Sequence, residues 1–174
     1  MMPALIRGVV MKKILLGLIV TVFFLGCSND KNVVVVSKTA VGNSLETLKL
    51  DDQFGNQQSL GADTKKVIFA FSKDMGHMSN AFFDKQEPGF LAKHHALFIA
   101  DVSGAPSLIR SMFIMPGLKE FKHTVLLIED ENVAASYRID EKSDKVMILD
   151  VDNFIIKNIG FAASEDELSK IFKQ

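Results

Sequence analysis

Three side chains suited to soft-metal chemistry lie close together in the stretch FAFSKDMGHMSNAFF, residues 69–83. Met75 and Met78 offer thioether sulfurs and His77 offers an imidazole, which are ligands that Cu(I) accepts. His123, which precedes another apolar run, is the candidate for a distant further ligand. Methionine also fills irregular space in protein cores. We therefore expect the two methionines in the core, His77 in solvent and no bound cofactor, and keep copper as the alternative.

A second candidate position lies at the end of a different apolar run. Asp101 and Ser103 end the stretch HALFIADVS, and α/β proteins place their sites at such strand ends. An aspartate there more often caps the turn that follows, here into Gly104. The sequence contains neither Gly-x-Ser-x-Gly nor His-Glu-x-x-His, so no hydrolase motif is present.

The elements that must position these residues alternate between apolar strands and amphipathic helices. We expect a hairpin over 41–60 with its turn at 51–56, strands over 66–72, 95–103 and 124–130, and a closing hairpin over 145–161 that turns at 152–153. Helices are expected from about residue 78, over 105–121, over 134–139 and from Ser164, where Ser-x-x-Glu forms a capping box. Buried strands that alternate with helices require an α/β sheet covered on both faces.

The helix expected over 105–121 carries four large apolar residues at helical spacing, which predicts a core-facing side. They are Leu108, Ile109, Met112 and Phe113. Met115 follows Met112 at i+3 and is expected in the same core. Pro116 and Gly117 then predict a break or a kink, because proline cannot continue the helical hydrogen-bond ladder.

The N-terminal part of the chain has the pattern of an export signal. Lys12 and Lys13 precede an apolar run over 14–25, which is shorter than the roughly 20 residues of a membrane-spanning helix. We interpret 1–10 as an upstream extension, 11–26 as the signal peptide, 27–40 as a tether and 41–174 as one domain. The Gly26-Cys27 pair resembles the lipobox of bacterial lipoproteins. This resemblance implies that Cys27 carries palmitate-type lipid and becomes the mature N-terminus, and Ser28 after it implies the periplasmic face of the outer membrane.

The charge of the mature chain argues against nucleic acid as a partner. The leader holds three of the 20 basic residues and none of the 21 acidic ones, so the mature chain has a net charge of −4. The basic residues are dispersed and form no stripe along which a phosphate backbone could lie. We expect attachment to a membrane through the lipid on Cys27 instead.

The order of these elements over 41–172 resembles the thioredoxin superfamily, in its branch of thiol peroxidases and exported thiol reductases. The resemblance implies a three-layer fold with a central mixed β-sheet flanked by helices, and residues 75–78 at the N-terminus of the first helix. The reductases hold Cys-x-x-Cys there, and this chain holds Met-Gly-His-Met. Aligned to the peroxidases, the stretch offers Ser72, Gly76 and Ser79 in place of their Pro, Thr and Cys.

Methionine and serine cannot replace the ionisable thiol of these enzymes, so thiol–disulfide and peroxidase chemistry are excluded. The stretches ADVSGAPSLI and MPGLKEF also resemble proteins described as flavin-containing dehydrogenases, yet no Gly-x-Gly-x-x-Gly follows a strand to bind a dinucleotide. We therefore expect a non-enzymatic binding or accessory module of the bacterial cell envelope. Its partner is expected to be another envelope protein or an extended peptide.

Overall fold

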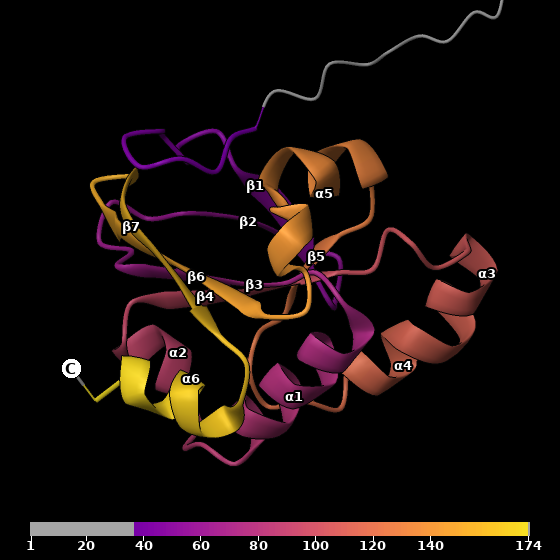
Figure 1. Cartoon of the computed structure of the whole chain (residues 1–174). Coiled ribbons are helices and arrows are strands. Elements are labelled where there is room, and N and C mark those ends of the chain that lie inside the picture. The colour runs from indigo at the N-terminus through magenta and orange to yellow at the C-terminus, as the bar shows by residue number, and fades with distance from the viewer. Residues whose placement is uncertain (1–36, 174) are drawn as a thin grey trace, which may run out of the picture. The chain divides into compact units, whose positions relative to one another are not determined.

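A computed structural model of the chain describes residues 37–173 (Figure 1). The predictions made on the extension, the signal peptide, Cys27 and most of the tether lie outside these residues. No helix within 37–173 is both long enough and apolar enough to cross a bilayer.

The described residues build one seven-stranded mixed sheet. Its strands are β1 (Lys49–Asp52), β2 (Gln57–Ser59), β3 (Lys66–Ala70), β4 (Ala96–Asp101), β5 (Leu126–Ile128), β6 (Val146–Asp152) and β7 (Ile155–Ala162). Their spatial order is β2-β1-β5-β4-β3-β6-β7. The three central strands β3, β4 and β5 run parallel, and β1 and β6 pair antiparallel to their outer sides.

Helices cover both faces of this sheet, as Figure 1 shows. One apolar cluster joins the sheet to α1 (Lys73–Asp84), α2 (Phe90–Lys93), α4 (Met115–Leu118) and α6 (Glu165–Ile171). The other cluster joins the opposite face to α5 (Glu131–Tyr137) and to the segment before β1. Neighbouring residues of β3 alternate between the clusters, since Ile68 lies in the first and Phe69 in the second. The structure thus confirms the mixed three-layer fold.

Local signals in the sequence account for most element boundaries. Ser164 begins α6 and accepts a hydrogen bond from the backbone N–H of Glu167 at 3.3 Å, while the Glu167 carboxylate accepts one from the N–H of Ala163 at 2.8 Å. The closing hairpin turns through Asn153 and Phe154, both with positive φ (46° and 67°). Two positive φ values in succession are the signature of the turn that matches the twist of paired strands.

The first helix begins earlier than predicted. It starts at Lys73 rather than near residue 78, because the Ser72 hydroxyl caps it by accepting from the N–H of Met75 at 3.4 Å. Asp74 adds a negative charge in the first turn, where the helix dipole favours one. Residues 75–78 therefore lie at the N-terminal end of α1, as expected from the fold.

The predictions for residues 105–121 were partly wrong. A single helical run passes through Pro116, made of α3 (Ser107–Ile109), a π-helical turn (Arg110–Ile114) and α4. In the π turn the N–H of Met115 bonds to the carbonyl of Arg110, five residues earlier. The proposed core side is in solvent: Leu108, Ile109, Met112 and Phe113 are all exposed. The wider π turn changes which residues face the sheet, so Ile114, Met115 and Leu118 pack there instead.

Candidate functional site

The candidate residues gather where the three parallel strands end. Ser72 and α1 follow β3, Asp101 is the last residue of β4, and Glu131 opens the helix that follows β5. Because these strands are parallel and adjacent, their carboxyl ends meet at one edge of the sheet. Open α/β sheets bind ligands at this edge. We call it the carboxyl edge.

The two methionines of α1 are half-buried and pack against the apolar cluster on that face of the sheet. His77 between them is exposed. The structure thus places Met75 and Met78 on the core and His77 in solvent, which is the arrangement expected for a chain without copper there. The copper hypothesis itself stays a prediction.

Ser79, which the resemblance to the peroxidases aligns with their cysteine, is buried in α1. It is 0% exposed, and its hydroxyl has no hydrogen-bond partner within residues 37–173. An activated nucleophile is hydrogen-bonded to a general base, and the described residues supply no such bond to Ser79.

His123 reaches α1 through Asn80 and not through the methionines. Its Nε2 lies 2.9 Å from the Asn80 amide oxygen, while the Asn80 nitrogen donates to the carbonyl of Gly76 at 2.9 Å. Since the amide oxygen can only accept, Nε2 carries the proton and Nδ1 is bare. Nδ1 is buried and has no partner among the described residues. Burial lowers the pKa of His123 to about 4, against a smaller opposing effect of Asp84.

A cavity beside His123 is too small for an ordinary ligand site. Its volume is about 240 Å³, and Phe83, Phe90 and Phe98 line its apolar wall. Small-molecule sites generally occupy about 300–1,000 Å³. Aromatic rings also pack against His123: the ring centroids of Phe83 and Phe121 lie 5.5 and 5.2 Å from the centroid of its imidazole.

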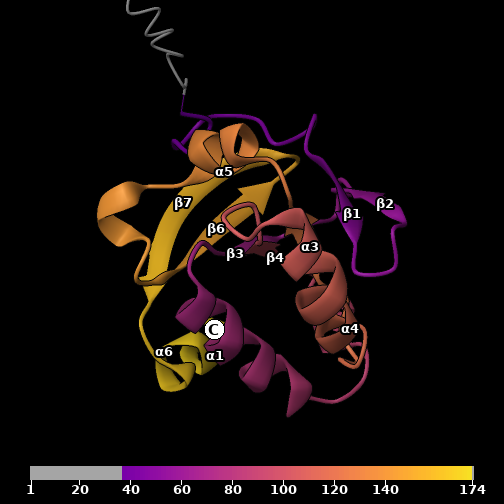
Figure 2. The same cartoon turned by 90° about the vertical axis from the view of Figure 1, so that its right-hand side faces the viewer.

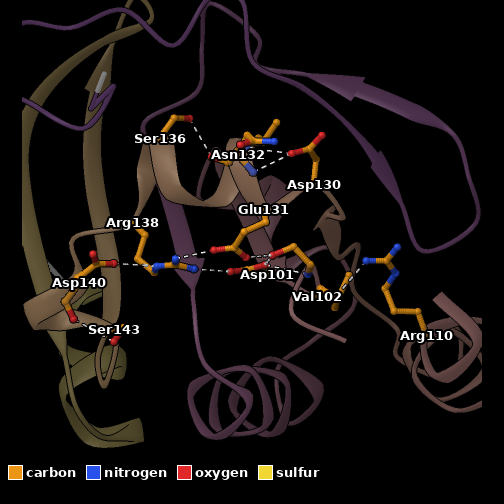
Figure 3. Close-up of polar contacts among 12 residues, drawn as sticks. Asp101, Val102, Arg110, Asp130, Glu131, Asn132, Ser136, Arg138, Asp140 and Ser143 are labelled. Carbon is orange, nitrogen blue, oxygen red and sulfur yellow. Dashed lines mark hydrogen bonds and ion pairs between the residues drawn. The ribbon is translucent and has the colours of Figure 1, made fainter. Parts of the chain in front are cut away.

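A polar network joins β4 to both ends of α5 (Figure 3). Arg138, the residue that ends α5, contacts three carboxylates: Glu131 at 2.7 Å, Asp140 at 2.9 Å and Asp101 at 3.4 Å. The Ser103 hydroxyl lies 2.6 Å from Asp101 Oδ1 and 2.8 Å from Glu131 Oε2. The Asp101 side chain is only 5% exposed, so these partners supply the hydrogen bonds that water would otherwise make.

Within the described residues, carboxylates already surround the one cation of this network, Arg138. The planar guanidinium of Arg138 already faces three acids, and its hydrogen bond is the first cause that lowers the pKa of Glu131. The predicted cap is confirmed, because the N–H of Ser103 donates to Asp101 at 2.9 Å. The partners of Asp101 were missed. Glu131 and Arg138 lie 30 and 37 residues further along the chain, and no local sequence signal connects them.

Comparison with known proteins supports the fold alone. No protein-family model matches the sequence, and no curated protein matches it. Among solved structures, a candidate protein disulfide isomerase from Bacteroides thetaiotaomicron has a TM-score of 0.50 and 15% identity, over 78% of this chain and 87% of that one. The peroxidoxin BcpB from Mycobacterium tuberculosis has a TM-score of 0.49 and 16% identity, over 76% and 94% of the two chains.

A SCO1/SenC family lipoprotein from Bacillus anthracis has a TM-score of 0.45 and 11% identity, over 75% of this chain and 93% of that one. At such identities a structural likeness carries no activity or ligand from one protein to the other. The fold is thioredoxin-like, and residues 28–174 contain no cysteine.

Removing the Arg138 charge should destabilise the domain strongly. Arg138→Met keeps an unbranched apolar stem but leaves the buried Asp101 carboxylate without its guanidinium, and we expect a loss of about 3 kcal/mol in urea unfolding at pH 7. Lys65→Met is the matched control, because Lys65 and its partner Asp152 are 54% and 60% exposed. That control should lose less than about 1 kcal/mol. Equal losses of unfolding free energy in the two variants would contradict a special role for the contact between Arg138 and Asp101.

The stability difference between wild type and Arg138→Met should depend on pH. Arg138 lowers the pKa of Glu131 in the folded state, so this contribution is present above the ordinary value of 4.5 and is lost as the pH falls through the lower folded value. The stability gap between wild type and Arg138→Met should therefore narrow below pH 4.5.

His123 should remain neutral in the folded protein until about pH 4. Because its folded pKa lies below the ordinary 6.5, its contribution to stability is complete above pH 6.5 and is lost as the pH falls toward 4. The measurement is an NMR titration of the imidazole resonances in the folded chain and in the urea-unfolded chain. Coincident titration curves would contradict the buried, Nε2-protonated ring.

Proposed function

We propose that this chain is a lipid-anchored, redox-inactive thioredoxin-like protein of the bacterial cell envelope that binds another envelope protein or an extended peptide. The observation that carries the proposal is the pair of residues at the start of α1. Met75 and Met78 stand at the positions of the reactive thiols and pack on the core, in a domain without cysteine. Neither side chain can form a thiolate or a reversible disulfide.

Polar contacts hold the described residues of the carboxyl edge in place. Ser72 caps α1 and Arg138 joins α5 to β4, while on the amino side of β5 His123 contacts Asn80 of α1. Replacing a whole buried ion pair by apolar residues is often neutral for stability, although removing one partner is costly, so we interpret these contacts as fixing the shape of the edge. An ordered edge without reactive groups suits recognition of a partner, since rigid groups lose little entropy on binding.

The lipid anchor rests on the sequence around Cys27. A short apolar run after two lysines, followed by Gly26-Cys27, supports export and acylation, and Ser28 supports the outer membrane with the domain in the periplasm. Copper binding by Met75, His77, Met78 and His123 remains the alternative function, and no contact in the described residues favours it.

Acylation is tested by metabolic labelling of cells with an alkyne fatty acid. The wild-type chain should take up the label, and Cys27→Ser should take up none, because no other thiol exists in the sequence. A label that persists in Cys27→Ser, or an unlabelled wild type, would exclude the lipobox interpretation.

Partner binding at the carboxyl edge is tested with a photoreactive phenylalanine placed at one of two exposed positions. His77 lies on α1 at the carboxyl edge, and Lys93 ends α2 close to the amino end of β4. In intact cells, the position of His77 should give discrete crosslinked products that the position of Lys93 does not give. Identical patterns, or none from either position, would argue against a binding edge at α1.

A further inference from the structure

One short stretch of helix holds most of the exposed large apolar side chains of the described domain. Leu108 is 65% exposed, Ile109 42%, Met112 59% and Phe113 67%, and these four span six residues of α3 and the π turn. We call them the apolar helix face. In Figures 1 and 2 this helical run projects from the sheet, with α3 at its outer end. A contiguous exposed apolar patch on a soluble protein generally marks a contact surface.

The outer side of this helix lacks the charged residues of an ordinary surface helix. Its one charged residue within 107–118, Arg110, turns inward: the side chain is 17% exposed and donates to the carbonyls of Val102 and Glu129 at 3.3 and 3.0 Å. Figure 3 shows Arg110 reaching the chain at Val102. Surface helices normally place charge outward and apolar residues inward. The outer side of this helix is therefore suited to an apolar surrounding.

The core does not require these four residues. The inner side of the same run is supplied by Ile114, Met115 and Leu118, which pack against the sheet cluster. The two sets meet inside the π turn, which ends at Ile114, and its wider winding gives each set its own direction. The inner residues alone attach this helix to the sheet, and the apolar helix face is available for another contact.

The surroundings favour a membrane over a second protein as the occupant. No acidic residue occurs between Asp101 and Glu120, and after the run the exposed Lys119 and Lys122 outnumber the exposed Glu120 between them. Such a combination of apolar and basic residues is typical of helices that lie at the surface of an anionic bilayer. Four partly exposed side chains offer on the order of a few hundred Å², well below the roughly 800 Å² per partner that a stable dimer buries.

The length of the tether allows this contact. Nine residues separate Cys27 from Ser37, where the described domain begins. Ten steps of a fully extended chain span at most about 36 Å. A lipid on Cys27 would therefore keep the domain within about its own diameter of the bilayer surface.

We propose that the apolar helix face inserts into the headgroup–acyl boundary of the bilayer to which Cys27 anchors the chain, and so fixes the orientation of the domain. This inference rests on the proposed lipid anchor. The 12-residue run from Ser107 to Leu118 is about 18 Å long, too short to span the bilayer, so it lies in the plane of the interface.

The test uses a single introduced fluorophore, because the chain has no tryptophan. Phe113→Trp in the full chain is reconstituted into phosphatidylcholine–phosphatidylglycerol vesicles, with or without bromine near the headgroup end of the acyl chains. We expect a blue-shifted emission and roughly a twofold loss of intensity in the brominated vesicles, as for a side chain at the acyl boundary. Phe54→Trp is the matched control, since Phe54 is 58% exposed in the turn between β1 and β2, and its emission should not change.

Vesicle flotation in the same samples separates this inference from the anchor. A chain that floats while the Phe113→Trp emission is unquenched overturns the membrane contact and leaves the anchor intact. A blue shift without bromine quenching also overturns it, and indicates cover by a protein or a second copy. Equal quenching of both tryptophans also overturns the proposal, because the domain would then lie against the bilayer without a fixed orientation. A chain that does not float overturns the anchor and the membrane contact together.

A second variant tests the face without changing the core. Leu108→Asp/Met112→Asp alters two exposed side chains, so it should fold, and in the Phe113→Trp background it should restore the unquenched emission while flotation persists. Quenching that survives these two charges contradicts the proposal.

Discussion

The burial of β3 and β4 on both faces is the constraint on which the rest of the molecule depends. Their side chains alternate between two apolar clusters, and neither face can be left to solvent. Parallel strands in such a sheet must be joined by crossovers that carry helices. Those crossovers bring the starts of α1, α3 and α5 to one edge, where Met75, His77 and Asp101 lie, whereas His123 precedes β5 at the opposite, amino end of the strands.

The polar groups at this edge are largely satisfied by one another. Arg138 meets three carboxylates and Ser72 meets the first turn of α1, while on the amino side of β5 the protonated nitrogen of His123 meets Asn80. Active sites instead keep groups poised for a substrate, with pKa values matched to proton transfer. The shifted values here have structural causes, namely burial for His123 and ion pairing for Glu131.

Sequence patterns predicted the elements whose signals are local. The apolar runs gave the strands, the capping box at Ser164 gave α6, and Asp152-Asn153 gave the closing turn to within one residue. The start of α1 was missed because Ser72 directly follows an apolar run, and its role as the N-cap of α1 depends on the backbone geometry. The side of the helix after β4 was assigned wrongly, since two apolar sets, at 108–113 and 114–118, compete for the core and only the tertiary contacts choose between them. The contact of Arg138 with Asp101 joins residues 37 positions apart and left no pattern in the sequence.

We propose above that this thioredoxin-like domain has no thiol redox activity. The most direct test is an assay of the purified full chain for reduction of peroxides and protein disulfides and for flavin-dependent electron transfer. The account predicts rates equal to those of buffer in all three assays. Turnover that copurifies with the chain and disappears in Met75→Ala or His77→Ala would contradict it.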